Sequence, residues 1–487
     1  MRFSLGSALI GLVALSSVVS AEPIPSKPKS HKPAKTPKDF FVDGKHIPGV
    51  PFAVSDSYAG LLPISAKKNE SREFFFWWYP AEGDVGKDDL TIWLNGGPGC
   101  SSLEGLLQEN GPWLLPFNST KVVKNPYSWT KLSNVLWIEQ PVGVGLGKGT
   151  PDITNENGVA DQFYGFLVEF FKTFPELKHK KLYITGESYA GKYIPYISGN
   201  LLKKSAAEKK ETGINFQGMA INDPSFASDL VLEQIPAVEF AIAYQKVLGL
   251  NDSTITNLKQ MAQQNGLENF VSKNLLYPPK GPIKLPSQLS PDYDAFDYLI
   301  NAATDANPCF NIYQIEYKCP GVTDPLGYPP QDSNPSATNF INNITGFKSY
   351  VHADPKQTWL ECVNDVFVGG TDTSPAPADT SLLRNVIEQS PSKRTLIQHG
   401  ELDAVLIANG SALAIQNTTW NGKQGLQHPL TKLIVNGKQA GHIQSERGLT
   451  FARIDHSGHM VPQDQPKTAF KLQKYVLGQI SYKDLLH

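Results

Sequence analysis

The sequence of 487 residues carries little charge of either sign: 18% of its residues are charged, and the formal net charge is −2. Such a balance provides neither a basic face for nucleic acid nor an acidic tail, so we expect no nucleic-acid partner. Aromatic residues make up 10% of the chain, which favours a large packed core over disorder. The length permits up to three domains of roughly 150 residues, although α/β folds often form one larger unit.

Long apolar runs are confined to the N-terminus, where Leu5 to Val19 follows Arg2 and leads into Ser20-Ala21. The run is shorter than the ~20 residues of a membrane span, and it has the charged start and small final residues of a signal peptide. We therefore expect residues 1–21 to be a signal peptide. The protein is then secreted to the extracellular space, with the vacuole as the alternative destination.

The segment at 22–39 is rich in Pro and Lys and has no apolar period, which predicts an arm or a propeptide outside the fold. No second long apolar run follows it. The C-terminus, Ser481 to His487, is polar, so we expect no lipid-anchor tail and no membrane anchor.

Cysteine is scarce as well, and four cysteines allow three pairings in an oxidising compartment. Asn-x-Ser/Thr sequons agree with that compartment and with glycosylation. The cysteines are Cys100, Cys309, Cys319 and Cys362, and the candidate glycosylation sites are Asn69, Asn118, Asn251, Asn343, Asn409 and Asn417.

Strands and helices are expected to alternate along much of the chain. Short apolar runs at 90–94 and 135–138 end at Gly or Pro, as buried parallel strands do. Apolar residues recur at helical spacing from 159 to 174, and a strand at 181–185 precedes a second helical pattern. This alternation predicts an α/β fold with a mostly parallel central sheet. Further strands are expected at 74–79, 219–222, 395–398 and 451–454, a hairpin at Asn436-Gly437 and a closing helix at 467–477.

The pattern changes between residues 224 and 370, where helical stretches mix with a Pro-rich segment and two cysteines. We interpret this part as a helical insertion that caps the active site. The predicted organisation is a first part of the α/β core at 40–223, the insertion at 224–370 and a second part of the core at 371–487.

Gly186-Glu187-Ser188-Tyr189-Ala190-Gly191 follows a predicted strand and opens a predicted helix. This is the context of a nucleophile elbow, in which a sharp turn projects a serine hydroxyl above the sheet. Ala190 replaces the last glycine of the usual G-x-S-x-G pattern. On this segment alone, a serine in an ordinary tight turn stays open as the alternative.

A serine nucleophile needs a base, and the base needs an acid that orients it. In α/β-hydrolases the chain order is serine, acid, histidine. Asp403 and His459 follow in that order, each in a loop just beyond a predicted strand. Position alone leaves four rivals open, which are His399, Glu401, Asp455 and His456.

Three segments resemble the signatures of the serine carboxypeptidase family, which has the α/β-hydrolase fold. They are Asn95-Gly96-Gly97-Pro98-Gly99-Cys100-Ser101-Ser102, the elbow at 186–191 and Gly458-His459-Met460-Val461-Pro462. Segments 109–112, 125–129 and 140–143 are also similar to family motifs, and the resemblance extends from about Phe40 to the C-terminus. Residues 220–224, Ala-Ile-Asn-Asp-Pro, are closer to the fungal carboxypeptidase S1-like branch than to the yeast vacuolar enzymes.

The resemblance implies a secreted serine-type carboxypeptidase that acts on peptide and protein C-termini at acidic pH, without cofactor or metal. The implied triad is Ser188, Asp403 and His459, and the implied oxyanion-hole donors are the N–H groups of Gly97 and Tyr189. The implied binding residues for the substrate carboxylate are Trp93, Asn95, Gly96, Glu109 and Glu187, and those of the S1 pocket are Val405 and Leu406. The implied disulfides are Cys100–Cys362 and Cys309–Cys319.

Two glutamates can hold a carboxylate only when a proton is shared, so Glu109 or Glu187 must be protonated. Clustered carboxyl groups in a partly dry pocket have raised pKa values, which makes this feasible at acidic pH. Glu187 as an ordinary solvated residue of the elbow is the alternative. A phosphate-binding role for the glycine-rich loop is disfavoured, because no Lys-Ser/Thr follows it and Pro98 lacks an N–H.

Three function classes compete on these residues. The first is a peptidase, the second an acyltransferase or esterase on the same fold, and the third a catalytically inactive binding module. A complete set of triad and oxyanion residues disfavours the third. Intact Asn95, Glu109 and Glu187 favour peptide carboxylates over the second. Side-chain preference and oligomeric state do not follow from the sequence.

Overall fold

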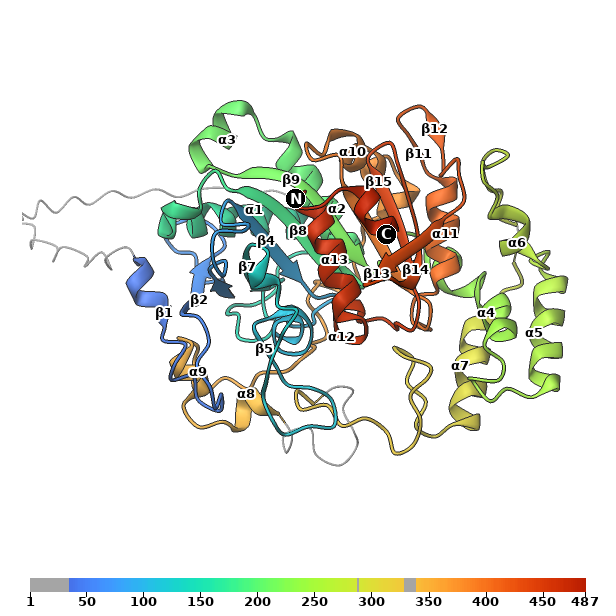
Figure 1. The fold of residues 1–487 in the computed structure, drawn as a ribbon, viewed down its shortest axis with the longest axis horizontal. Coiled ribbons are helices and arrows are strands. Elements are labelled where there is room, and N and C mark those ends of the chain that lie inside the picture. The colour runs from blue at the N-terminus through green and yellow to red at the C-terminus, as the bar shows by residue number, and fades with distance from the viewer. Residues whose placement is uncertain (1–34, 287–288, 328–338) are drawn as a thin grey trace, which may run out of the picture. The chain divides into compact units, whose positions relative to one another are not determined.

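The computed structural model describes residues 35–286, 289–327 and 339–487, so the predicted signal peptide and all of the predicted arm before residue 35 lie outside the described residues. The described fold begins at a short 3₁₀ turn, Pro37–Phe40, whose last residue is buried. From there one central sheet of eleven strands organises the chain (Figure 1).

Six adjacent strands in the middle of the sheet run parallel. In sheet order they are β7 (Asn134–Glu139), β4 (Asp89–Leu94), β8 (Lys181–Glu187), β9 (Asn215–Asn222), β10 (Thr395–Gly400) and β15 (Leu449–Ile454). Antiparallel strands complete both edges: β1 (Phe41–Val42), β2 (Ser57–Pro63) and β3 (Glu73–Tyr79) before β7, and β14 (Lys438–Glu446) and β13 (Thr431–Val435) beyond β15. This mixed, mostly parallel sheet confirms the predicted α/β-hydrolase fold class.

Strand β2 was not expected from the sequence. It is covered on both faces, so it lacks the alternation of a half-exposed strand, and Gly60 and Pro63 are disfavoured in strands. Gly60 has a φ of +144°, and a Cβ there would meet the ring of Phe40 at 2.7 Å. Packing of Gly60 against Phe40, in the first turn of the fold, therefore favours a strand at β2 despite its residue types.

Alternate side chains of each strand point to opposite faces of the sheet. From β3, Phe74 and Phe76 enter one core, beneath α1 (Glu156–Thr173), α2 (Ala190–Lys203) and α10 (Leu382–Gln389). Phe75 and Trp77 enter a second core on the other face. On that second face, α13 (Pro466–Val476) covers the strands from β8 to β15.

The insertion divides into two parts (Figure 1). Its helices α4 (Ala237–Ala243), α5 (Asp252–Gln264), α6 (Phe270–Asn274) and α7 (Ala295–Ala306) share a core with α11 (Ala408–Asn417). Helices α8 (Phe340–Asn343) and α9 (Phe347–Tyr350) instead pack on the second face of the sheet, together with Trp359. The boundaries proposed for the core and the insertion stay predictions.

Further short elements lie between these. They include α3 (Ala206–Thr212), α12 (Val461–Asp464) and two small hairpins, β5 (Trp113–Leu114) with β6 (Val123–Lys124) and β11 (Thr419–Trp420) with β12 (Lys423–Gln424). Within the described ranges, no helix combines the length and the apolar character that crossing a bilayer requires.

Candidate active site

Ser188 lies in the sharp turn between β8, which ends at Glu187, and α2, which begins at Ala190. Its φ is +61°, a left-handed conformation that is uncommon for any residue except glycine. The turn is held from β9, because the Ser188 N–H donates to the carbonyl of Asn222 at 3.0 Å and its own carbonyl accepts from Ser225 N–H at 2.9 Å. The serine is therefore fixed in the conformation of a nucleophile elbow, at the carboxyl edge of the sheet.

Asp403 and His459 follow the carboxyl ends of β10 and β15, which are adjacent parallel strands. The Oδ2 atom of Asp403 lies 2.7 Å from Nδ1 of His459. Its Oδ1 atom accepts the N–H groups of Val405 at 2.8 Å and Leu406 at 3.2 Å. Burial alone would raise the pKa of Asp403, but the charge of His459 and the side-chain hydrogen bonds of His399 and His459 hold it below its usual value. An ionised aspartate thus orients the imidazole.

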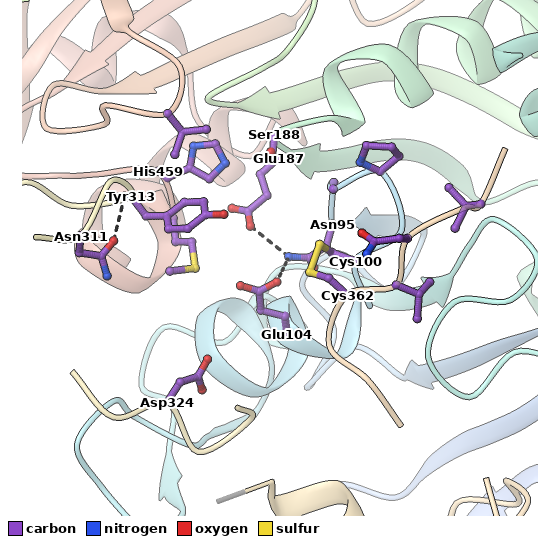
Figure 2. A pocket seen from close by; sticks show the side chains of 18 of the residues that line it. Asn95, Cys100, Glu104, Glu187, Ser188, Asn311, Tyr313, Asp324, Cys362 and His459 are labelled. Atoms are coloured by element: carbon purple, nitrogen blue, oxygen red, sulfur yellow. Dashed lines mark hydrogen bonds between the residues drawn. A yellow bond between two sulfur atoms is a disulfide. The ribbon is translucent and has the colours of Figure 1, made fainter. Parts of the chain in front are cut away.

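The other ring nitrogen of His459, Nε2, is buried and accepts no hydrogen bond from the part of the chain that the structure describes. Tyr313 of the insertion holds this histidine: its carbonyl accepts the His459 N–H at 2.8 Å, and the two rings lie 5.3 Å apart. Ser188, His459 and Tyr313 all line a pocket of about 660 Å³ (Figure 2). Nε2 is thus the nitrogen left to act as a base within that pocket.

The four rival residues have other partners or are exposed, although His399 also lies 3.4 Å from Asp403. Nδ1 of His399 lies 2.9 Å from Ser411 Oγ, and its Nε2 lies 2.5 Å from the carbonyl of Leu406. Glu401 makes two hydrogen bonds of 2.7 Å to Arg453. Asp455 accepts from Gln439, and His456 is exposed. None of the four lines the pocket beside Ser188.

The glycine-rich loop after β4 packs directly against the elbow. A Cβ on Gly96 would lie 2.4 Å from the Tyr189 nitrogen and 2.7 Å from Ser188 Cβ, so only glycine fits there. Gly97 has a φ of +107°. Over the described ranges, the N–H groups of Gly97 and Tyr189 donate to no protein acceptor. Two such donors beside a serine can stabilise an oxyanion.

Asn95, at the start of that loop, organises a cluster of acids. Its Oδ1 accepts from Trp93 Nε1 at 2.7 Å and from the Gly105 N–H at 3.1 Å, which fixes the orientation of the amide. Its Nδ2 therefore points at two carboxyl groups, Glu187 Oε1 at 3.0 Å and Glu104 Oε2 at 3.1 Å (Figure 2). Trp93 is fully buried and does not line the pocket, so it acts by holding Asn95.

Glu104 was not singled out from the sequence, although it lines the pocket. It immediately precedes the helical turn Gly105–Asn110, which also carries Glu109. Burial raises the pKa of all three acids. Burial and then the charge of Asp324 raise the pKa of Glu104 to about 8. Burial and then the charge of Glu104 hold the pKa of Glu109 well above 4.5, and burial and then the charge of Glu109 do the same for the pKa of Glu187. Protonated Glu104 and Glu187 thus lie in the pocket with Ser188, and Glu109 is buried and does not itself line it.

Of the two residues predicted for the S1 pocket, Val405 lines the pocket and Leu406 does not. Leu406 is buried in the core that lies against α1 and α2. Both backbone N–H groups are tied to the same carboxylate oxygen of Asp403, so the two side chains leave that turn in different directions. The pocket wall near Asp403 is therefore made by Val405.

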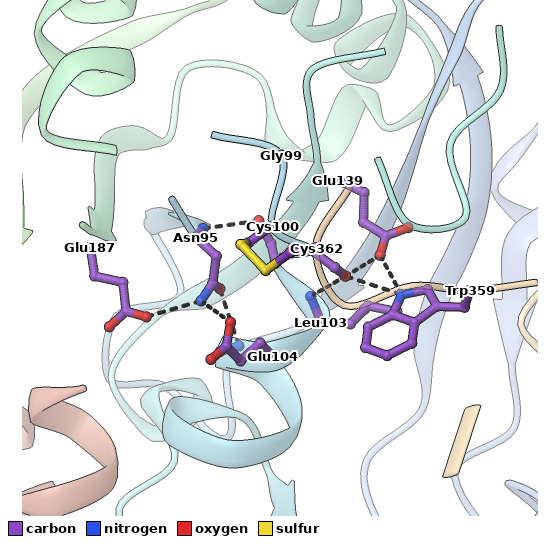
Figure 3. The surroundings of a disulfide bond; sticks show 12 residues. Asn95, Gly99, Cys100, Leu103, Glu104, Glu139, Glu187, Trp359 and Cys362 are labelled. Atoms are coloured by element: carbon purple, nitrogen blue, oxygen red, sulfur yellow. Dashed lines mark hydrogen bonds between the residues drawn. A yellow bond between two sulfur atoms is a disulfide. The ribbon is translucent and has the colours of Figure 1, made fainter. Parts of the chain in front are cut away.

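Cys100 is bonded to Cys362 and Cys309 to Cys319, which is the pairing that the resemblance implied. The first disulfide joins the glycine-rich loop to the insertion. Beside it, buried Glu139 accepts hydrogen bonds from Ser101 Oγ, the Leu146 N–H and Trp359 Nε1. Figure 3 shows Glu139 and Trp359 near this disulfide. Burial raises the pKa of Glu139 to about 7. The loop is thus tied to its surroundings at two points.

Asp223, His399 and Asp403 form a group close enough for a cation to touch all three. The donor atoms of two of the three are already committed, because Asp403 Oδ2 contacts His459 and His399 Nε2 contacts the Leu406 carbonyl. We therefore assign no metal to this group. Five of the six sequon asparagines are exposed, and Asn409, within α11, is half-buried.

A serine, a histidine and an aspartate presented at the carboxyl ends of β8, β15 and β10 define an α/β-hydrolase of the nucleophilic-serine class. Comparison with known proteins narrows this class. The sequence profile of the serine carboxypeptidase family matches residues 48–479. The chain belongs to the serine carboxypeptidase family and is a serine-type carboxypeptidase.

Fungal relatives agree with this assignment. The chain is 42% identical, over 91% of its length and 87% of the relative, to a "Probable serine carboxypeptidase" of Arthroderma benhamiae. It is 39% identical to "Serine-type carboxypeptidase F" of Aspergillus niger, over 89% and 86% of the two chains. The crystal structure of Kex1(Δ)P, a prohormone-processing carboxypeptidase from Saccharomyces cerevisiae, has the same fold. The TM-score is 0.70 at 23% identity, over 92% of this chain and 97% of that one.

Proposed function

We propose that the protein is secreted to the extracellular space and removes C-terminal residues from peptides and proteins at acidic pH. The observation that carries this proposal is the cluster of protonated acids around Asn95, of which Glu104 and Glu187 line the pocket beside Ser188. A carboxylate entering this cluster meets the amide of Asn95 and carboxylic O–H donors in place of repelling charges. An esterase or acyltransferase on the same fold has no use for such a cluster.

Ser188 is the nucleophile in the proposed mechanism. Its hydroxyl attacks the carbonyl carbon of the last peptide bond while Nε2 of His459 takes the hydroxyl proton. Asp403 keeps the imidazole in position through Nδ1. The N–H groups of Gly97 and Tyr189 donate to the oxyanion that forms.

The protonated His459 then gives its proton to the departing amine, and the C-terminal amino acid leaves. The remaining acyl-enzyme is an ester of Ser188. Water attacks this ester after losing a proton to His459, and the shortened peptide is released as Ser188 regains its proton.

Recognition of the substrate's free carboxylate is assigned to Asn95, Gly96, Glu109 and Glu187, with Trp93 holding Asn95. Glu104 joins this set, because it shares the Nδ2 group of Asn95 with Glu187. Val405 contributes to the wall that faces the residue before the scissile bond.

The sequence supports secretion through the predicted signal peptide, and the exposed sequons and two disulfides suit an oxidising compartment. The vacuole is the alternative destination. Membership of the S1-like branch stays a prediction from residues 220–224.

The experiment offers the purified protein a blocked dipeptide with a free C-terminus and, separately, its C-terminal amide, at pH 5. We expect release of the C-terminal amino acid from the free acid at a much higher kcat/KM than release of the amino-acid amide. Ser188→Ala is the control for a contaminating peptidase. Equal cleavage of both substrates would assign the chain to a general amidase or esterase activity, and transfer to an added alcohol without hydrolysis would assign it to an acyltransferase.

A further inference from the structure

A second aspartate lies behind the triad acid. Asp223 follows β9, the strand between β8 and β10, and it is completely buried. Its φ is +42°, in the left-handed region, and its N–H donates to the carbonyl of Gln398 at 2.8 Å. The Gly400 N–H donates to its Oδ1 at 2.8 Å. This carboxyl is therefore held firmly, in a conformation that costs backbone energy, at the end of the strand next to Asp403.

The other carboxyl oxygen of Asp223, Oδ2, has no N–H or O–H donor among the described residues. The carboxyl group of Asp403 lies beside that of Asp223: one oxygen of each acid and a ring nitrogen of His399 all lie within 4.8 Å of one another. No lysine or arginine in the described ranges forms an ion pair with either acid. Two ionised carboxylates side by side in a buried site are strongly disfavoured, so one of them holds a proton.

Hydrogen-bond donors decide which acid holds it. Asp403 accepts from the N–H groups of Val405 and Leu406 and from His459, which together stabilise its charged form. Asp223 accepts from one N–H, that of Gly400. Burial, followed by the charge of Asp403, raises the pKa of Asp223 well above its usual value.

Other ionisable groups act in the same direction. From α12, Asp464 adds a further repulsion on Asp223, and Asp223 and Glu187 of β8 repel each other. His399 Nε2 lies 3.5 Å from Asp223 Oδ1 and 3.4 Å from Asp403 Oδ2, but it is closer to the Leu406 carbonyl, which can only accept. A neutral His399 with the proton on Nε2 therefore satisfies both of its nitrogens, since Ser411 Oγ can donate to Nδ1.

We propose that Asp223 is a neutral carboxylic acid that donates a hydrogen bond to the Asp403 carboxylate and so positions the triad acid and limits the negative charge that His459 faces. This inference rests on the proposed role of Asp403 in the triad. Asp223 touches neither substrate nor the reacting atoms, so it is a positioning residue. Without the hydrogen bond from Asp223, His459 would face the full charge of the Asp403 carboxylate. With it, His459 stays neutral, and thus able to act as base, at lower pH.

The test compares two variants of similar size, Asp223→Asn and Asp223→Leu, by the pH dependence of kcat/KM for a blocked amino-acid ester. An ester lacks the free carboxylate, so the fall of its kcat/KM at low pH (the acidic limb of the profile) reports the protonation of His459 and not that of the glutamate cluster. Asparagine keeps an N–H donor for Asp403, whereas leucine offers none. We expect the Asn variant to keep the wild-type limb and activity within about threefold, and the Leu variant to shift the limb upward by about one pH unit with an about ten- to hundredfold lower kcat.

Asp89→Asn is the matched control, because Asp89 is a buried acid at the opposite end of β4. It should leave the limb unchanged. If the Leu variant does not fold, infrared spectra of the wild type and the Asn variant still decide the matter. The wild type should show the carbonyl band of a protonated carboxyl at pH 6 that the Asn variant lacks.

Three results would overturn the proposal. The first is an acidic limb of the kcat/KM profile in the Leu variant at the same pH as in the wild type. The second is a shifted acidic limb in the Asn variant. The third is identical infrared bands of protonated carboxyl groups in the wild type and the Asn variant. The last would mean that Asp223 is ionised and paired with a charged His399. Asp403→Asn separates this inference from its premise: activity retained in that variant would refute the triad itself, whatever the Asp223 variants do.

Discussion

The acid cluster around Asn95 predicts that KM for a peptide with a free C-terminus rises with pH, and that Glu109→Gln flattens this rise. The substrate carboxylate is ionised from about pH 4 upward, so the pH dependence comes from the enzyme. While the cluster is protonated it offers O–H donors. Once it loses its first shared proton, it presents a negative charge to a negative ligand.

The structure sets the range of this effect. Glu104 has a pKa of about 8, and the pKa values of Glu109 and Glu187 are also well above 4.5. KM should therefore be nearly constant from pH 4 to 5 and rise towards pH 8. Loss of one required proton changes KM by up to about tenfold per pH unit. Glutamine at position 109 donates at every pH, so its rise between pH 5 and 8 should shrink to about threefold or less, with a higher KM at pH 5.

The assay measures KM from pH 4 to 8 for a blocked dipeptide and for its C-terminal amide, in the wild type and in Glu109→Gln. Glu82→Gln is a control, since Glu82 is an exposed acid outside the pocket. The amide should show no KM rise in any of the proteins. The same pH dependence for both substrates in the wild type would refute carboxylate recognition by these glutamates.

Three further predictions concern the rest of the molecule. Cys362→Ser should lower the free energy of unfolding by roughly 2–5 kcal/mol, measured by urea denaturation, and a free Cys100 thiol in the native wild type would contradict the pairing. Glu139 has a pKa of about 7 in the folded state, so its contribution to the free energy of unfolding is complete below about pH 4.5 and is lost as pH rises to 7. The loss is roughly 3 kcal/mol, and the free energy of unfolding of Glu139→Gln should not show it over the same pH range. Mass spectrometry after glycosidase treatment should find glycan at exposed sequons such as Asn69 and Asn251 and none at half-buried Asn409, and an occupied Asn409 would contradict this.

Local sequence patterns predicted the middle of the fold well. Runs such as Leu90–Leu94 and Val135–Ile138 are apolar throughout because parallel strands are buried on both faces, and both lie in central strands of the sheet. The segment around Ser188 was predicted from a strand, a tight turn and a helix that are contiguous in the chain. The packing of α8 and α9 against the second face of the sheet could not be predicted, because it joins segments about 260 residues apart.

The same limit applies to the site. Glu104 stands between Leu103 and Gly105 and has no local feature that distinguishes it from a solvated helix residue; only its contact with Asn95 places it in the pocket. Tyr313 reaches His459 from the insertion, across 146 residues of chain. Asp223 was noticed in the sequence only as part of a branch-specific motif. Its position behind Asp403 depends on the order of β9 and β10 in the sheet.

The most direct test of the central claim is to label the protein at pH 5 with a serine-directed fluorophosphonate and to locate the label by peptide mass spectrometry. A blocked amino acid with a free carboxylate and its amide are added as competitors in parallel samples. We expect a label on Ser188 alone, with protection by the free acid and little by the amide. A label on another residue, or equal protection by both competitors, would contradict a serine carboxypeptidase that recognises the C-terminal carboxylate beside Ser188.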